Sequence, residues 1–282
     1  MIIVLVITDW KWPWSQPVSY GWYHIVWLII MIAVSVILCL TLAKKHDKAI
    51  DNKVIFIFGV LLVAIELYKQ IFFTLDEGHY QWYAFPFQFC SVPMYFAFIA
   101  PLIKKEKIQD AMYKFIAIYG LLAGLAVMAY PGTCFHTDYV TILLHTMIWH
   151  ASMVIMGIYL IVSRRYCSNI KDITKEVMPA TIIFSGLVIF ALLVNIIGYK
   201  LYFGTDKNIY NDTLYLMYIS PYYSNPFPIL GAIKEKVPYV VFFLLYLACF
   251  AVGISVLWLG IFGIRKLTSL INNKPKKEIT NN

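Results

Sequence analysis

The chain has 282 residues, of which 61% are hydrophobic and only 13% charged, whereas ordinary soluble domains have about 45–50% and 25%. Its mean hydropathy is +0.73. A soluble monomer of this composition would have to expose a large apolar surface. The composition therefore excludes a soluble enzyme, a disordered chain and a DNA-binding module. It predicts an all-α protein with several membrane-spanning helices, built as a single transmembrane domain over residues 1–282.

Seven stretches of the sequence are long and apolar enough to cross a bilayer. A helix rises about 1.5 Å per residue, so about 20 apolar residues span the hydrocarbon layer. We expect spans at about 22–43, 54–74, 85–103, 111–130, 139–163, 177–201 and 237–264. The longest connection, 202–236, is rich in tyrosine and proline. Because tyrosine rings favour the headgroup zone, we expect this loop to lie on the outer leaflet as a lid.

The basic residues indicate the orientation of the chain. Its net charge is +8 and its pI about 9.1. Most cations fall in alternate connections, namely 44–53, 104–114, 164–176 and the tail 265–282, whereas connections 75–84 and 131–138 hold none. Positively charged connections stay in the cytoplasm. We therefore expect an outside N-terminus, a basic cytoplasmic tail over 265–282, a multi-pass protein of the cell membrane, and no nucleic-acid partner.

A few polar side chains interrupt the apolar spans, all of them in the outer half of the bilayer or near its middle. By helix rise, Cys90 and His145 lie about 8 and 9 Å below the outer surface, and His150 about 17 Å. The halves beside the cationic connections read as almost purely apolar. Because polar groups in hydrocarbon are costly, they mark a candidate site. The set predicts a shared chamber that opens outward: Glu66, Lys69, Gln70, Cys90, His145, His150 and Asn195.

Several of these residues also have a purely structural interpretation. Glu66 and Lys69 are three positions apart and can neutralise each other on one helix face. Asn195 can serve as a hydrogen-bond partner between helices. His145 and His150 point about 140° apart around their helix, so they do not form a metal pair. The five cysteines show no paired spacing, and we expect neither a metal nor another cofactor.

The expected third span has an unusual beginning, YAFPFQFCSVPMYF. Pro86 and Pro93 remove backbone donors on either side of Cys90 and distort the helix there. Gln88 and the freed carbonyls then lie beside the thiol. These residues alone leave two interpretations open, a reactive thiol or an inert cysteine at a prolyl kink.

Three blocks of sequence resemble one family in the same order. They are FPFQFC at 85–90, WHASMVIMGIYLI at 149–161, and NDTLYLMYISPYYSNPFPILG at 211–231. The chain thereby resembles the YwaF family of bacterial membrane proteins, which is related to the eukaryotic transmembrane protein 164 group. The first family motif has the form LPLHLC, so Gln88 replaces a histidine here. The resemblance implies lipid acyl chemistry through a cysteine nucleophile, with membrane lipids as substrates and His150 as the family histidine.

This resemblance leads to a mechanistic hypothesis. Cys90 would attack a lipid ester after an imidazole takes its proton. His150 ranks first as the base by resemblance, and His145 second because it lies level with Cys90. Gln88 could stabilise an oxyanion but could not act as a base. Acyl transfer or hydrolysis would follow, in a chamber lined by Gln88, Glu66, Lys69, Gln70 and Asn195. The alternatives are a transporter or receptor for small solutes or lipids that uses the same residues as a pocket, and a structural scaffold.

Overall fold

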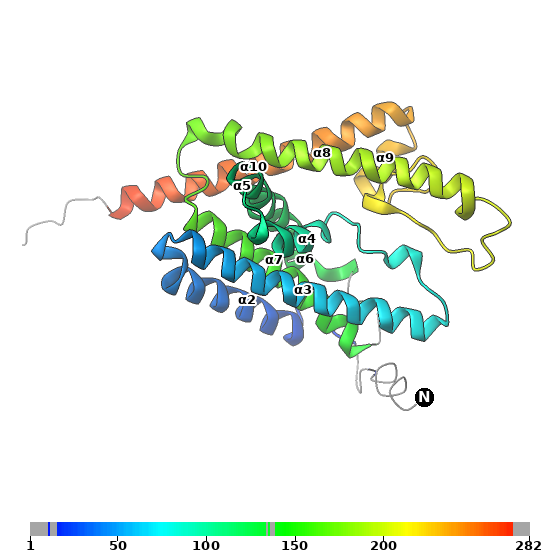
Figure 1. The fold of residues 1–282 in the computed structure, drawn as a ribbon, viewed down its shortest axis with the longest axis horizontal. Coiled ribbons are helices and arrows are strands. Elements are labelled where there is room, and N and C mark those ends of the chain that lie inside the picture. The colour runs from blue at the N-terminus through cyan, green and yellow to red at the C-terminus, as the bar shows by residue number, and fades with distance from the viewer. Residues whose placement is uncertain (1–10, 12–15, 134, 136–138, 273–282) are drawn as a thin grey trace, which may run out of the picture.

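A computed structural model shows that the protein is a bundle of apolar helices (Figure 1). It describes residues 11, 16–133, 135 and 139–272. Six helices in this part are long and apolar enough to cross a membrane: Trp22–Lys45, Lys48–Glu77, Glu106–Ala129, Val140–Ser163, Ile170–Phe203 and Tyr239–Leu270. The prediction of a polytopic all-α membrane protein is confirmed.

The individual helices follow the predicted spans with shifted ends. They are α2 (Trp22–Thr41), α3 (Lys48–Glu77), α4 (Val92–Ile99), α5 (Glu106–Phe115), α6 (Leu121–Ala129), α7 (Val140–Ser163), α8 (Ile173–Gly198), α9 (Pro228–Lys234) and α10 (Tyr239–Asn272). Helix α3 begins earlier than predicted because the Asp47 side chain accepts from the backbone N–H of Ala49 and Ile50, which caps its first turn. It ends at Glu77, and the Gly78 that follows has a left-handed φ of 71°, as is common after the last helical residue.

The third predicted span is the main departure. The expected helix over 85–103 is wrong for residues 85–91, which form turns, because α4 begins only at Val92. Pro93 lies in the first turn of α4, where its missing N–H breaks no helical bond. The apolar helical stretch therefore covers only Val92–Leu102. Passage of this segment across the whole bilayer stays a prediction.

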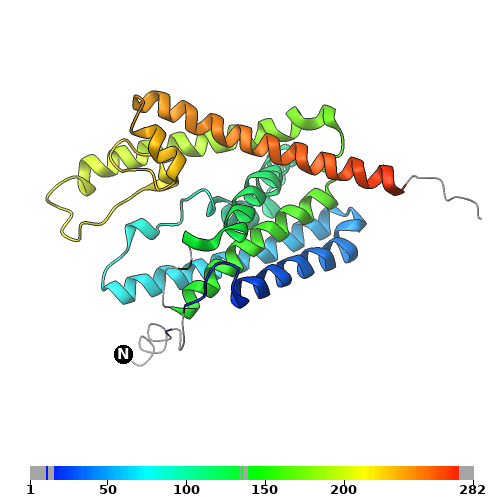
Figure 2. The ribbon, with the colours of Figure 1, turned by 180° about the vertical axis from the view of Figure 1, so that it is seen from behind.

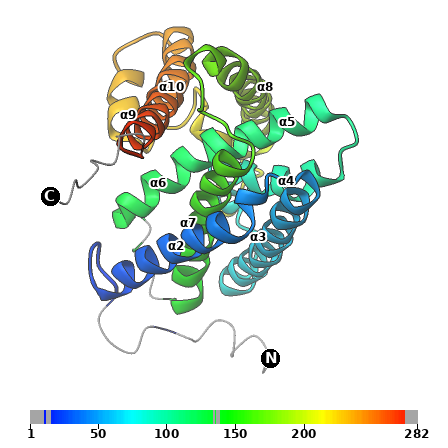
Figure 3. The same ribbon diagram turned by 90° about the vertical axis from the view of Figure 1, so that its left-hand side faces the viewer.

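The helices form two groups with one long helix between them. Figure 3 shows α2, α3 and α7 on one side, α8 and α10 on the other, and α5–α6 crossing between. Helices α5 and α6 are continuous through a π-helical turn at Ile116–Gly120. Glycines allow α6 and α7 to pack closely, since a Cβ on Gly124 would lie 2.8 Å from Val154 Cγ2 and one on Gly157 would lie 2.7 Å from Leu121 Cβ. Small residues at such contacts are typical of membrane helices.

The four cation-rich segments meet at one end of the bundle, which we call the basic end (residues 44–53, 104–114, 164–176 and 265–270). Figure 2 shows the α2–α3 and α7–α8 connections beside the end of α10. Lys48 pairs with Glu106 at 2.9 Å, and Lys114 Nζ donates to the Lys175 carbonyl at 3.1 Å. The connections that are rich in cations thus lie together at one end of the fold. Helix α10 continues through Asn272, so the predicted tail begins as helix, and residues 273–282 lie outside the described residues.

The long connection between α8 and α9 does not lie wholly on the surface. Its residues 211–225, which we call the tongue, enter the protein beside α8 and α10. Met217, Ile219 and Ser220 are completely buried. The prediction of a lid lying on the membrane surface is therefore wrong for this part. Hydropathy could not reveal it, because the tongue is not an apolar helix but an irregular segment enclosed by helices.

Candidate functional site

Four predicted site residues are in direct contact, and we call them the outer cluster: Glu66, Lys69, Gln70 and His145. Glu66 Oε1 lies 2.9 Å from Lys69 Nζ and accepts from Gln70 Nε2 at 2.7 Å. The other carboxylate oxygen lies 3.5 Å from His145 Nε2. Glu66 is 4% exposed and His145 8%. Helices α3 and α7 thus bring these polar residues into contact.

Cys90 lies in the turn that precedes α4, and neighbouring helices hold this turn through its carbonyl groups. Trp149 Nε1 of α7 donates to the Cys90 carbonyl at 2.9 Å. The Pro86 carbonyl accepts from the Tyr95 hydroxyl at 2.9 Å, and the Ala84 carbonyl from Gln70 Nε2 at 2.7 Å. Irregular backbone at membrane depth requires such partners. Cys90 itself is partly buried and forms no disulfide.

The two histidines of α7 face different surroundings, as their spacing predicted. The His145 ring stacks on Trp149 with centroids 5.1 Å apart. His150 Nδ1 lies 2.8 Å from the Thr146 carbonyl of its own helix. Because a carbonyl can only accept, this contact assigns the proton to Nδ1 and leaves a lone pair on Nε2 of the neutral ring. His150 therefore has the tautomer that a general base needs.

Gln88 links the Cys90 turn to the tongue. Its Nε2 donates to the Tyr215 carbonyl at 2.8 Å, and the backbone N–H of Met217 donates to the Phe87 carbonyl at 3.0 Å. Burial raises the pKa of the Tyr215 phenol, which donates to the Tyr223 carbonyl as a neutral group. The two irregular segments of the fold therefore meet beside the candidate nucleophile.

Asn195 holds the tongue rather than joining the outer cluster. Its Nδ2 donates to the carbonyls of Leu216 and Ile219 at 3.0 and 2.6 Å, and its Oδ1 accepts from the Leu216 N–H at 2.9 Å. Its side chain is 1% exposed. These bonds correspond to the structural interpretation of Asn195, whereas a contact with substrate stays a prediction.

A second buried polar group lies at the basic end, and we call it the inner cluster: Asp51, Tyr113, Tyr159 and Arg164. Arg164 Nε lies 2.6 Å from Asp51 Oδ2, and Tyr159 donates to Asp51 Oδ1 at 2.9 Å. The Arg164 guanidinium lies 5.0 Å from the Tyr113 ring centroid. Asp51 and Arg164 lie in connections that the sequence analysis placed outside the spans, so this cluster was not among the predicted site residues.

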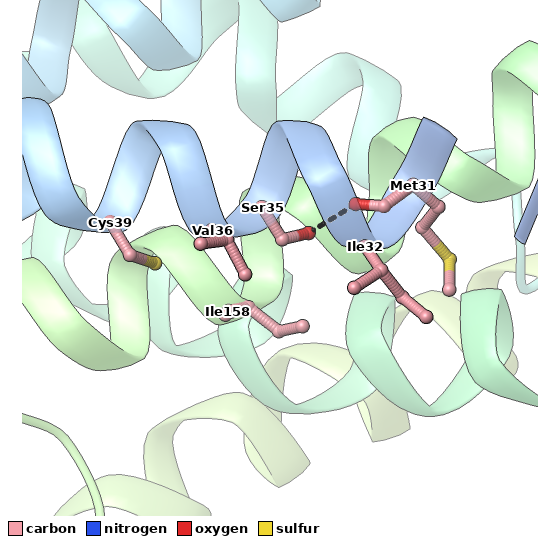
Figure 4. A pocket seen from close by; sticks show the side chains of 6 residues that line it. All are labelled: Met31, Ile32, Ser35, Val36, Cys39 and Ile158. Atoms are coloured by element: carbon pink, nitrogen blue, oxygen red, sulfur yellow. Dashed lines mark hydrogen bonds between the residues drawn. The ribbon is translucent and has the colours of Figure 1, made fainter. Parts of the chain in front are cut away.

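The predicted open chamber does not coincide with either of two grooves on the protein. One groove of about 300 Å³ lies on α2 and is lined by Met31, Ile32, Ser35, Val36, Cys39 and Ile158 (Figure 4). The Ser35 hydroxyl donates to the Met31 carbonyl of its own helix at 2.7 Å. This hydrogen bond uses the hydroxyl proton within α2. The other groove, about 650 Å³, lies between α9 and α10. The outer cluster is instead closely packed.

Trp149 is the site residue that sequence reasoning missed. A tryptophan in an apolar span gives no polar signal, and only its position four residues after His145 placed it on the same helix face. Two of its contacts in the fold, His145 and Cys90, were both candidates. Their common contact with one indole could not be predicted without the course of the 82–91 segment.

Comparison with known proteins gives one match. Residues 19–264 match the TMEM164 family. No curated protein and no solved structure matches the chain. The matched region contains all seven predicted spans and every candidate site residue.

Proposed function

This chain belongs to the TMEM164 family, and we propose that it is an acyltransferase of the cell membrane that carries a phospholipid acyl chain on Cys90. The YwaF-type bacterial branch is the subgroup that we propose for it. The observation that carries the proposal is the hydrogen bond from Trp149 to the Cys90 carbonyl. It joins the backbone of Cys90 to Trp149, which stacks on His145 and directly precedes His150 in the sequence.

The proposed reaction begins with a proton transfer. His150 Nε2 takes the Cys90 proton, and the thiolate attacks the ester carbonyl of a phospholipid. The tetrahedral intermediate collapses when the ester C–O bond breaks. The imidazolium returns the proton to the departing lysolipid oxygen, leaving an acyl thioester on Cys90. Transfer is complete when His150 deprotonates a second lysolipid hydroxyl, which attacks the thioester and restores the thiol. Water in place of that hydroxyl would give hydrolysis.

Gln88 is the proposed oxyanion partner. An amide nitrogen has two hydrogens, and the backbone carbonyl of Tyr215 accepts one of them. The second N–H can donate to the oxygen that becomes negative during attack, and such a preorganised donor contributes about 10²–10³ in rate. The tongue would thereby fix the orientation of the donor before substrate binds.

The Glu66–His145 contact supports a second role in the same site. A carboxylate beside an imidazole stabilises its protonated form, and Lys69 and Gln70 hold this carboxylate in place. We propose that His145 stabilises negative charge that develops during the reaction. His145 becomes the general base if replacement of His150 proves harmless.

Acyl exchange in vesicles tests the proposal. The full chain would be reconstituted with phospholipid and an isotope-labelled lysolipid, and labelled phospholipid would be followed by mass spectrometry. We expect Cys90→Ser to abolish exchange and His150→Gln to lower it by about 10²–10⁴, the usual contribution of general acid–base catalysis. Cys39→Ser and Cys249→Ser are matched controls on α2 and α10 and should leave exchange unchanged. A folded Cys90→Ser protein with full exchange would contradict the proposal.

One observation favours a second candidate, a transporter for lipids or small solutes. The turn before α4 and the tongue are irregular segments that meet inside the protein, and broken helices of this kind form substrate sites in transporters. A transporter would move labelled lipid between leaflets equally well with Ser at position 90. The acyltransferase would instead lose its activity with that change.

A further inference from the structure

Trp149 contacts both the candidate nucleophile and the outer cluster. Its indole N–H donates to the Cys90 carbonyl, and its ring stacks on His145, which in turn faces Glu66. We infer that Trp149 is a positioning residue, resting on the proposed function, that sets the geometry and reactivity of the Cys90 thiol. A contact chain thus runs from α3 through α7 to the Cys90 turn.

The sequence explains why the Cys90 carbonyl needs a partner from another helix. In a helical turn this carbonyl would accept from the N–H three or four residues later. Pro93 occupies the first of these positions and has no N–H. The N–H of Met94, at the second position, bonds to the Ser91 carbonyl at 3.1 Å. Trp149 therefore satisfies a carbonyl that Pro93 deprives of its nearest local donor.

The bond has a direct consequence for the thiol. The carbonyl and the side chain of Cys90 share one Cα, so directing the carbonyl toward α7 restricts where Sγ can point. The turn has further constraints on its preceding side, since Ser91 N–H bonds to the Gln88 carbonyl at 2.9 Å and Gln88 is held by the tongue. Loss of the indole donor would leave one end of the turn free to rotate.

A merely structural tryptophan would behave differently. Trp149 is 3% exposed, so any truncation would create a cavity and lower stability. A packing role alone predicts that loss without a change in the chemistry of Cys90. The positioning role predicts that removal of the N–H, with the aromatic ring retained, alters the reactivity of the thiol itself.

The experiment measures alkylation of Cys90 in the purified full chain. N-ethylmaleimide would be added across a pH series, and modification of each cysteine peptide would be followed by mass spectrometry. Exposed Cys249 on α10 is the internal reference. The variant is Trp149→Phe, and the matched control is Trp258→Phe, which removes an indole donor to Glu176 that is bonded at 2.7 Å near the basic end.

We expect Trp149→Phe to change the Cys90/Cys249 rate ratio by about fivefold or more and to shift its pH dependence, because one buried hydrogen bond contributes about 1 kcal/mol. Trp258→Phe should lower the melting temperature and leave the ratio unchanged. A Trp149→Phe ratio and pH profile equal to those of the wild type would overturn the inference. An equal change in Trp258→Phe would overturn it as well.

A second variant serves if Trp149→Phe does not fold. Pro93→Ala gives the Cys90 carbonyl a competing backbone donor, so it should also change the ratio, and an unchanged ratio would overturn the inference. The readout is independent of acyl transfer. If Cys90→Ser retains exchange while Trp149→Phe changes alkylation, the proposed function fails and the positioning role stands. The opposite pair of results rejects the positioning role alone.

Discussion

The inner and outer clusters both join α3 to α7, but they do so with different chemistry. The inner cluster pairs Asp51 with Arg164 at 2.6 Å, and an arginine stays charged under all ordinary conditions. The outer cluster pairs Glu66 with Lys69 and, at 3.5 Å, with His145. Lysine and histidine can both release a proton. We therefore assign a structural role to the inner cluster, whereas the proposed function gives the outer cluster a role in the reaction.

The largest expected effect comes from Asp51→Asn. This change removes the charge that Arg164 faces and leaves a buried guanidinium unpaired, so we expect the free energy of unfolding to fall by about 3–5 kcal/mol. Thermal unfolding in detergent would measure it. Lys48→Ala removes the exposed Lys48–Glu106 pair and should cost about 0–1 kcal/mol. If Asp51→Asn and Lys48→Ala lowered the free energy of unfolding equally, the inner cluster would not be a structural link.

Asn195→Ala tests whether Asn195 is a structural residue or a substrate contact. It removes three buried hydrogen bonds to the tongue. At about 0.5–1.5 kcal/mol for each bond, we expect a stability loss of about 2–4 kcal/mol. Limited proteolysis should then cut within residues 204–227. A stable, protease-resistant variant that has lost lipid binding would instead make Asn195 a substrate contact.

Gly59 lies on α3 between the two clusters, in close contact with the backbone of α4. A Cβ there would lie 2.5 Å from the Phe98 nitrogen and 2.6 Å from the Ala97 carbonyl carbon. Because backbone atoms cannot move aside cheaply, Gly59→Ala should lower the free energy of unfolding by about 1–3 kcal/mol. Gly186→Ala on α8 meets no atom within 4 Å and should be neutral or stabilising by up to about 1 kcal/mol. Thermal unfolding of both variants checks this contrast.

Glu66→Gln is expected to lower stability less than Asp51→Asn or Asn195→Ala. The amide oxygen still accepts a hydrogen bond from the neighbouring side chains, so the loss should be about 1 kcal/mol. Acyl exchange should fall by at least about tenfold, the equivalent of 1.4 kcal/mol in the barrier. A stability loss as large as that of Asp51→Asn, with exchange unchanged per folded molecule, would make the outer cluster a structural link too.

Much of this arrangement could be predicted from the sequence. Hydropathy located the six long helices, and charge alternation predicted that four basic segments share one end. The sequence placed Glu66 and His145 in the outer halves of their spans, and the structure brings them into contact. These properties depend on residue type and spacing along one helix, which a sequence displays directly.

Other features depend on contacts between distant segments. Residues 85–91 are apolar enough for a span, but their backbone forms turns whose carbonyls are held by Trp149, Tyr95 and Gln70. The tongue is buried because Asn195, three residues before the end of α8, bonds to its backbone. Neither interaction leaves a periodic pattern, so neither could be predicted from composition or hydropathy.

Direct trapping of an acyl-enzyme tests the central claim, that Cys90 carries the acyl chain. The reconstituted full chain would be incubated with phospholipid, quenched in acid and digested, and its cysteine peptides examined by mass spectrometry. We predict an acyl group on the Cys90 peptide that hydroxylamine removes, with more of it in the absence of lysolipid acceptor. An unmodified Cys90 peptide in a preparation that exchanges acyl chains would contradict the account.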